Sequence, residues 1–265
     1  MVGSRAPDLA PDLAPDLAPE PVATAAEPVA TAIDPKAVLG DLSGGRVLDV
    51  ATGTGGFVRF LLDGLRDHAE IVGIDANAER AAAFSEAFAD RPDVRFEQMD
   101  ALHLVFPDGS FDTVCVSNSL HHFADPTPAL AEMLRVLRPG GHLVVNEMYR
   151  DSQSETQATH VLLHHWWAAV NRLRGEVHRE TYERRPIVEI VEGLGLTDLR
   201  IVDLADPDED PHDPESTAEL EAAIDRYVVL ADGHPELQAR GATLRTRLRE
   251  VGVRGATQLV AIGRA

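Results

Sequence analysis

The stretch VLDVATGTGGF, residues 47–57, passes from an apolar run through an aspartate into a series of small residues. This pattern predicts a buried strand over 46–51, a tight glycine turn and a helix over 56–66. Glycines let a ligand approach the backbone without meeting a Cβ atom, and free N–H groups at a helix start favour an electronegative group. Such a turn is typical of a nucleotide-like cofactor site, although a plain strand-to-helix connection can also be rich in glycine.

Strand and helix patterns alternate strictly after this turn. Strands such as RVLDV and HLVVNEM are apolar on both faces and are separated by helices. We therefore expect a parallel sheet with helices covering both sides, and ligands beyond the carboxyl ends of the strands. The predicted strands are 46–51, 70–75, 94–98, 111–117 and 141–148, and the predicted helices between them are 56–66, 77–90 and 126–137.

The first 33 residues differ from the rest of the chain. PDLA occurs three times and EPVATA twice, and proline is too frequent for a helix or a strand. We expect a disordered, Pro/Ala-rich tail over 1–33 and a single folded domain over 34–265.

The charge narrows the range of partners. With 24 basic and 44 acidic residues the net charge is −20, which repels phosphate backbones and anionic lipid headgroups. We expect no nucleic-acid or membrane partner. The one cysteine, Cys115, excludes an internal disulfide and a cysteine-based metal cluster. Because no apolar run is long enough to span a bilayer and the N-terminus lacks a signal-peptide core, we expect a cytoplasmic protein.

Acidic residues follow the second and third predicted strands. Asp75 ends the second strand, where a carboxylate can accept both hydroxyls of a ribose, or can cap the helix that begins near Ala78. Asp100 follows the third strand and could accept a hydrogen bond from an adenine amino group, or belong to a surface turn. Residues 118–122 close the fourth strand at the same edge.

Four motifs in this order resemble the class I methyltransferases that use S-adenosylmethionine, especially the ubiquinone and menaquinone C-methyltransferases. They are VLDVATGTG, GIDAN, MDALHLVFPDGSFDTVCVSNSLHHFADP and LAEMLRVLRPGGHLVVNEM. The resemblance covers roughly residues 40–150. It implies a Rossmann-like, doubly wound α/β fold with a seven-stranded sheet whose last strand is antiparallel. The remaining chain permits this, with strand patterns at 196–204 and 256–265 and helices near 215–232 and 235–250.

The resemblance also implies a cofactor, S-adenosyl-L-methionine, and its binding residues. These are Asp49, Ala51, Gly53 and Gly55 at the methionine end, Asp75 and Ala76 at the ribose, Asp100 and Ala101 at the adenine, and Asn118 at the methionine part or the substrate. The implied activity is transfer of a methyl group to oxygen, nitrogen or carbon of a small-molecule acceptor by in-line displacement. The chain departs from the common glycine pattern in having Ala51 at its first small position.

The segment after the fifth strand is the candidate for acceptor binding. Residues 155–174 have a helical pattern, and we expect residues 150–182 to form a lid above the carboxyl ends. The predicted acceptor contacts are His121, His122, Trp166 and Trp167, and the candidate proton acceptors are His160, His164 and His165.

Other interpretations of these residues stay open. Tryptophans at helical spacing also pack in cores, and helical histidines also serve as ordinary hydrogen-bonding groups. His160 and His164 are spaced as metal ligands, with His178 and Glu180 following. Because no glutamate stands between them in the metalloprotease manner and cysteine ligands are absent, we predict no metal site.

Two other functions are compatible with parts of the pattern. An NAD(P)-dependent oxidoreductase would share the glycine turn and the acidic residue after the second strand. The only lysine, Lys36, precedes the glycine turn, so no Tyr-x-x-x-Lys pair is available. A non-catalytic regulator or scaffold that binds S-adenosylmethionine is the second alternative, but Asp49, Asp75 and Asp100 are all present, which favours a working enzyme.

Overall fold

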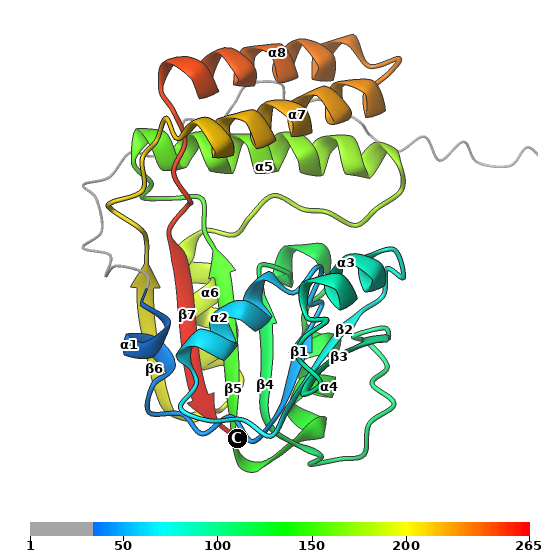
Figure 1. Ribbon diagram of the computed structural model, residues 1–265, viewed down its shortest axis with the longest axis vertical. Helices are drawn as coiled ribbons and strands as arrows, with labels where there is room; N and C mark the ends of the chain where they lie inside the picture. Colours follow the sequence, from blue (N-terminus) through cyan, green and yellow to red (C-terminus); the bar gives the residue numbers. More distant parts are fainter. Residues whose placement is uncertain (1–33) are drawn as a thin grey trace, which may run out of the picture.

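A computed structural model describes residues 34–265, so the predicted tail at 1–33 lies outside the described residues (Figure 1). One sheet of seven strands has the order β3-β2-β1-β4-β5-β7-β6. All neighbours are parallel except β7, which is antiparallel to both β5 and β6. The predicted fold class is therefore confirmed. The strands are β1 (Arg46–Val50), β2 (Glu70–Asp75), β3 (Val94–Gln98), β4 (Phe111–Ser117), β5 (Leu137–Met148), β6 (Thr197–Leu204) and β7 (Gln258–Arg264).

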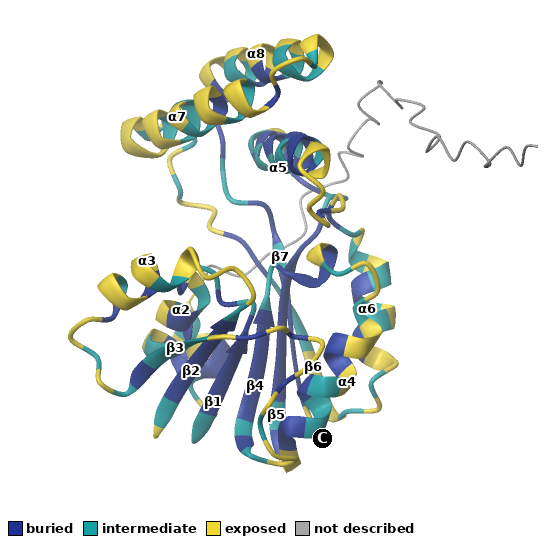
Figure 2. Ribbon diagram, turned by 90° about the vertical axis from the view of Figure 1, so that its right-hand side faces the viewer, coloured by how far each residue is buried: buried dark blue, intermediate teal, exposed yellow. Residues whose placement is uncertain are grey.

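Helices cover both faces of this sheet (Figure 2). α1, α2 and α3 pack on one face, and α4 and α6 pack on the other. Alternation along β1 supplies both cores: Val47 packs with the first group of helices, while Leu48 and Val50 pack with the second. The helices are α1 (Pro35–Leu39), α2 (Gly56–Gly64), α3 (Arg80–Ala87), α4 (Thr127–Val136), α5 (Glu155–Leu173), α6 (Arg184–Glu192), α7 (Pro214–Leu230) and α8 (Pro235–Glu250), with a short 3-10 helix η1 (Leu120–His122).

A third layer, made of α5, α7 and α8, stacks above the carboxyl ends of the parallel strands (Figure 1). It has a hydrophobic core of its own, in which Leu163, Trp166 and Val170 of α5 pack with Ile224 of α7 and Leu248 of α8. The start of α5 is set by a capping box between Ser154 and Gln157. Among the described helices, none combines the length and the apolar character needed to cross a bilayer.

The start of α3 differs from the prediction of a helix from residue 77. The Asp75 carboxylate accepts a hydrogen bond from Asn77 N, and the Asn77 side chain accepts one from Glu79 N. These two local turns delay the helix to Arg80, with Glu79 in the N-cap position. Asp75 is therefore not the cap of α3, and its carboxylate stays at the edge of the sheet.

Candidate functional site

A cavity of about 640 Å³ lies at the carboxyl ends of the strands. The loops after β1, β2, β3 and β4 form its floor and sides, and residues of α5, α7 and the segment after α5 reach it from the third layer. The predicted cofactor residues that line it are Asp49, Ala51, Gly53, Asp75, Ala76, Asp100, Ala101 and Asn118. The topology thus brings eight of the nine residues together, and Gly55 is the one that does not line the cavity.

The glycine turn after β1 places a buried carboxylate in the wall of this cavity. Asp49 is 1 % exposed, and its Oδ2 accepts a hydrogen bond of 2.6 Å from Thr52 Oγ1. Its Oδ1 is buried and has no hydrogen-bond partner among the described residues. The pKa of Asp49 is raised to about 7, chiefly by burial and in part by the nearby Asp75 carboxylate, while the hydrogen bond from Thr52 acts in the opposite direction. The free oxygen suits a cationic or hydrogen-bond-donating group of a ligand.

Asp75 ties two loops together at the edge of the cavity. Its Oδ2 accepts a hydrogen bond of 3.0 Å from Gly53 N, and its Oδ1 accepts one of 2.8 Å from Asn77 N. Gly53 has a φ of +57°, and a Cβ atom at this position would meet nothing of residues 34–265 within 4 Å. The turn therefore leaves open space at Gly53, as close approach of a ligand requires.

Asp100 and Asn118 follow β3 and β4, two strands that β2 and β1 separate in the sheet. Asp100 Oδ1 accepts a hydrogen bond of 2.9 Å from Leu102 N, and Ala101 beside it is buried. Asn118 takes a φ of +46°, and its Oδ1 accepts a hydrogen bond of 2.8 Å from Met148 N of β5. Asn118 thus joins the ends of β4 and β5, which positions its backbone at the cavity.

Gly55 is needed for the packing of the glycine turn against the phenylalanines of the core and does not line the cavity. Its φ is +88°, and a Cβ atom there would lie 2.3 Å from the Phe88 ring and close to Phe84. We expect Gly55→Ala to lower the free energy of unfolding by roughly 2–4 kcal/mol, because left-handed strain and overpacking add. Gly53→Ala is the control, since the added methyl group has open space and carries only the strain. Urea denaturation of both variants tests this, and equal losses would contradict it.

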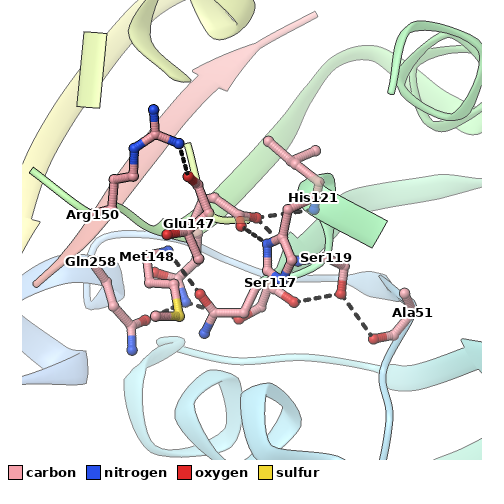
Figure 3. A network of polar contacts seen from close by, with 12 residues as sticks. Ala51, Ser117, Ser119, His121, Glu147, Met148, Arg150 and Gln258 are labelled. Atoms are coloured by element: carbon pink, nitrogen blue, oxygen red, sulfur yellow. Dashed lines mark hydrogen bonds and ion pairs between the residues drawn. The ribbon is translucent and has the colours of Figure 1, made fainter. Parts of the chain in front are cut away.

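The floor beneath η1 is built on a fully buried carboxylate, Glu147 of β5 (Figure 3). Its Oε2 accepts hydrogen bonds of 3.0 Å from both Ser119 N and Leu120 N, and its Oε1 pairs with His121 Nδ1. Glu147 therefore holds the first residues of η1 and orients the His121 ring. Glu147 is not among the predicted site residues, although an acidic residue inside the apolar run HLVVNEM is the pattern that could have indicated it.

The predicted acceptor contacts are only partly at the cavity. His122 lines it, together with His178 from the segment after α5, while the neighbouring His121 of η1 is fully buried and does not line it. Desolvation and, to a lesser extent, neighbouring histidines lower the pKa of His122 to about 4 and that of His178 to about 3. Both rings are therefore neutral near pH 7.

Trp166 and Trp167 lie outside the set of residues that line the cavity. Trp166 is fully buried in the core of the third layer, and its Nε1 donates a hydrogen bond of 2.9 Å to Leu237 O. Trp167 packs against Tyr227 of α7, with ring centroids 5.9 Å apart. Tyr227 itself lines the cavity. The helical spacing that we interpreted as acceptor contact at Trp166 therefore reflects packing between helices.

The three candidate proton acceptors of α5 do not line the cavity either. His160 Nδ1 accepts a hydrogen bond of 2.9 Å from Ala256 N, and His165 Nε2 accepts one of 3.2 Å from Thr181 N. These two rings tie α5 to neighbouring segments. His164 instead faces His121 and His178, with ring centroids 4.8 Å from each.

Some residues on the side of the cavity where the acceptor is expected belong to no motif and could not be predicted from the sequence. Beyond His178 and Tyr227, the third layer contributes Asn171 and Glu176 to the lining, and Arg80 of α3 reaches it as well. Asn171 shares a helical face with His164 in the sequence, which is the pattern that could have pointed to it. Only the chain path of the third layer brings Glu176 and Tyr227 to the same cavity.

Comparison with known proteins agrees with this geometry. Residues 48–145 match the model of the methyltransferase domain family. Demethylmenaquinone methyltransferase of Deinococcus radiodurans is 48% identical over 103 residues, which are 38% of this chain and 42% of that protein. Ubiquinone/menaquinone biosynthesis C-methyltransferase UbiE of Pseudomonas paraeruginosa is 38% identical over 115 residues, 42% of this chain and 45% of that protein. The chain thus spans less than half the length of these curated relatives.

Among solved structures, the [4+2]-cyclase SpnF has a TM-score of 0.56 and 24% identity, and the match covers 84% of this chain and 76% of that one. At this identity the likeness concerns the fold alone. The word cyclase denotes a ring-forming reaction, so the fold by itself does not decide the chemistry. The reaction has to be argued from the cavity and its residues.

Proposed function

We propose that this chain, whose residues 48–145 form a class I methyltransferase domain, transfers a methyl group from S-adenosyl-L-methionine to a small-molecule acceptor. The observation that carries the proposal is Asp49, a buried carboxylate in the cavity wall with one oxygen left without a partner among the described residues. S-adenosylmethionine carries an ammonium group that suits this oxygen, and the glycine turn beside it leaves room for a ligand.

The other cavity residues fit the remaining parts of the cofactor. Asp75 would accept hydrogen bonds from the ribose hydroxyls, and Asp100 from the adenine amino group, with Ala101 against the ring. When bound, the cofactor supplies a methyl group that is already activated on a sulfonium. The protein then has to align the acceptor with that methyl group and to exclude water.

Part of the acceptor side of the cavity is formed by segments that lie beyond the family match. The family match ends at residue 145, before α5, α7 and the segment that carries Glu176 and His178. The names of the quinone C-methyltransferases therefore support methyl transfer more than they support a quinone acceptor. Oxygen, nitrogen and carbon acceptors all belong in the first screen.

Calorimetric titration with S-adenosylmethionine, S-adenosylhomocysteine and NAD tests the cofactor. We expect both sulfur compounds to bind with micromolar or lower Kd and NAD not to bind. A panel of phenols, amines and quinols is then incubated with S-adenosylmethionine, and products one methylene heavier are sought by mass spectrometry. Binding of NAD alone would overturn the proposal. Tight binding of S-adenosylmethionine with no transfer to any of the three classes would favour the non-catalytic alternative.

Asp75→Ala is expected to weaken binding of S-adenosylmethionine by roughly 10- to 100-fold, since hydrogen bonds to a charged group are worth about 1.5–3 kcal/mol. The variant also loses the carboxylate that holds Gly53 N and Asn77 N in place. Calorimetry checks this, with Asp90→Ala as the control because Asp90 is an exposed carboxylate after α3. Equal affinities of the two variants would remove Asp75 from the site.

A further inference from the structure

Four histidines from three segments meet beside the cavity. They are His121 and His122 of η1, His164 of α5 and His178 of the segment after α5, and one ring nitrogen of each lies within 4.8 Å of all the others. The His122 and His178 ring centroids are 4.1 Å apart, and those of His121 and His164 are 4.8 Å apart. The contact brings the floor of the cavity and the third layer together.

Three nitrogens of this cluster are buried and have no hydrogen-bond partner within residues 34–265: His121 Nε2, His164 Nδ1 and His178 Nε2. Buried polar atoms in folded proteins are nearly always paired, because an unpaired one costs about 1–3 kcal/mol. If these histidines served only in packing, three buried nitrogens would stay unpaired within one small volume. Their convergence indicates a ligand that accepts several imidazole lone pairs at once.

Two of the rings also have a hydrogen-bond partner at their other nitrogen, Nδ1. Glu147 pairs with His121 Nδ1, and the Asn171 amide lies 3.0 Å from His178 Nδ1. When Nδ1–H donates to Glu147, the lone pair of His121 is on Nε2, which faces the cluster. The oxygen and nitrogen of an Asn amide are interchangeable in assignment, so Asn171 can accept from His178 Nδ1–H in the same way. Partners of this kind orient metal-ligating histidines.

We propose that His121, His122, His164 and His178 bind one divalent transition-metal ion, with Zn²⁺ as the first candidate. Neutral imidazole is a preferred ligand of Zn²⁺, and the fully buried Glu147 carboxylate offsets part of the charge. Zn–N distances of about 2.0–2.1 Å put tetrahedral ligand atoms about 3.4 Å apart. The rings would therefore close by roughly 1 Å, which side-chain rotations allow.

This set differs from the one that the sequence spacing suggested. His164 and His178 belong to both, but His160 is engaged with Ala256 N, and Glu180 is not in the cluster. His121 and His122 of η1 take their places, because the His121 ring of η1 lies against the His164 ring of α5. The expectation that the chain holds no metal site is the one that this proposal replaces.

The position of the cluster gives the ion a role in the reaction, and this part rests on the proposed function. His122 and His178 line the cavity, so the ion would lie in its wall. Zn²⁺ can expand from four to five ligands, so an oxygen atom of the acceptor could take a fifth position from the cavity side, where the ion would polarise it and lower the pKa of its proton. It would take over the task that the sequence analysis assigned to histidine bases.

The full chain, freed of metal with a chelator and of any affinity tag, is titrated with Zn²⁺ by calorimetry. We expect one ion per chain with micromolar or lower Kd, a rise in Tm, and visible absorption bands when Co²⁺ replaces Zn²⁺. His164→Ala should lose at least roughly 100-fold in affinity, as should His122→Ala. His165→Ala is the matched control on the same helix, because its ring is bound to Thr181 instead.

Zn²⁺ affinities that are the same in the wild type, His164→Ala and His122→Ala would overturn the metal site, as would no uptake by the wild type. If His164→Ala does not fold, the stoichiometry, the Tm shift and the Co²⁺ spectrum of the wild type decide. Binding of S-adenosylmethionine is titrated separately on the metal-free protein. Metal uptake without binding of S-adenosylmethionine would overturn the proposed function and support the metal site. Binding of S-adenosylmethionine without metal uptake would support the proposed function and overturn the metal site.

Discussion

Asp49→Asn is expected to weaken binding of S-adenosylmethionine and of S-adenosylhomocysteine alike, by roughly 30-fold or more, as expected when one member of a buried, hydrogen-bonded charge pair is removed. The reason is that Asp49 is 1 % exposed and offers its free Oδ1 in the cavity wall. Both ligands carry the ammonium group that would pair with it, whereas only S-adenosylmethionine carries the sulfonium. Calorimetry with the two ligands measures the effect.

The pH dependence of binding gives a second measure of the same interaction. Burial raises the pKa of Asp49 to about 7, so the carboxylate is only partly ionised below that pH. Pairing with a cation needs the ionised form, and wild-type affinity should fall about tenfold between pH 8 and pH 6. In Asp49→Asn this dependence should be absent.

The ligand-free variant should be more stable than the wild type above pH 7. A carboxyl group whose pKa is higher in the folded than in the unfolded chain contributes stability below the unfolded value near 4, and this is lost as the pH rises through 7. Asparagine does not ionise, so the Tm advantage of the variant should grow from pH 4 to pH 7. Asp63→Asn, an exposed change on α2, is the control. In the binding measurements, an Asp49→Asn variant that loses affinity for S-adenosylmethionine but keeps its affinity for S-adenosylhomocysteine would show that Asp49 pairs with the sulfonium and not with the ammonium group.

Glu147→Ala is expected to lower the free energy of unfolding by roughly 3–5 kcal/mol, the usual cost of breaking a buried, hydrogen-bonded ionic group. The change leaves Ser119 N, Leu120 N and His121 Nδ1 without their partner in a region that is fully buried. Because these groups form the start of η1, the loss should extend to the cavity floor. Chemical denaturation of the metal-free protein measures the effect.

The matched control for this change is Glu189→Ala. Glu189 forms an exposed pair with Arg185 on α6, and surface pairs contribute little to stability. We expect no measurable change there. Glu147→Gln should fall between the two, because an amide oxygen can still accept from both backbone N–H groups. A Glu147→Ala variant as stable as the Glu189→Ala control would show that the floor network does not hold η1.

Local patterns in the sequence were enough for most of the fold. Alternating strands and helices, the glycine turn and the acidic strand ends are properties of short segments, and they predicted the sheet and the set of residues at its carboxyl edge. Gly55 shows what local patterns could not predict. Its motif position indicated the cofactor, whereas its Cβ direction, which faces Phe88, depends on how α3 packs.

Which residues form the acceptor side of the cavity is decided by the tertiary structure. The sequence could place His160, His164, His165 and Trp166 on one helix, because helical geometry is local. It could not say which of their sides faces the cavity, since α7 and α8 take up one side of α5 and the strand ends lie below it. His121, His164 and His178 are far apart in the chain, and only the stacking of the third layer over η1 makes them neighbours.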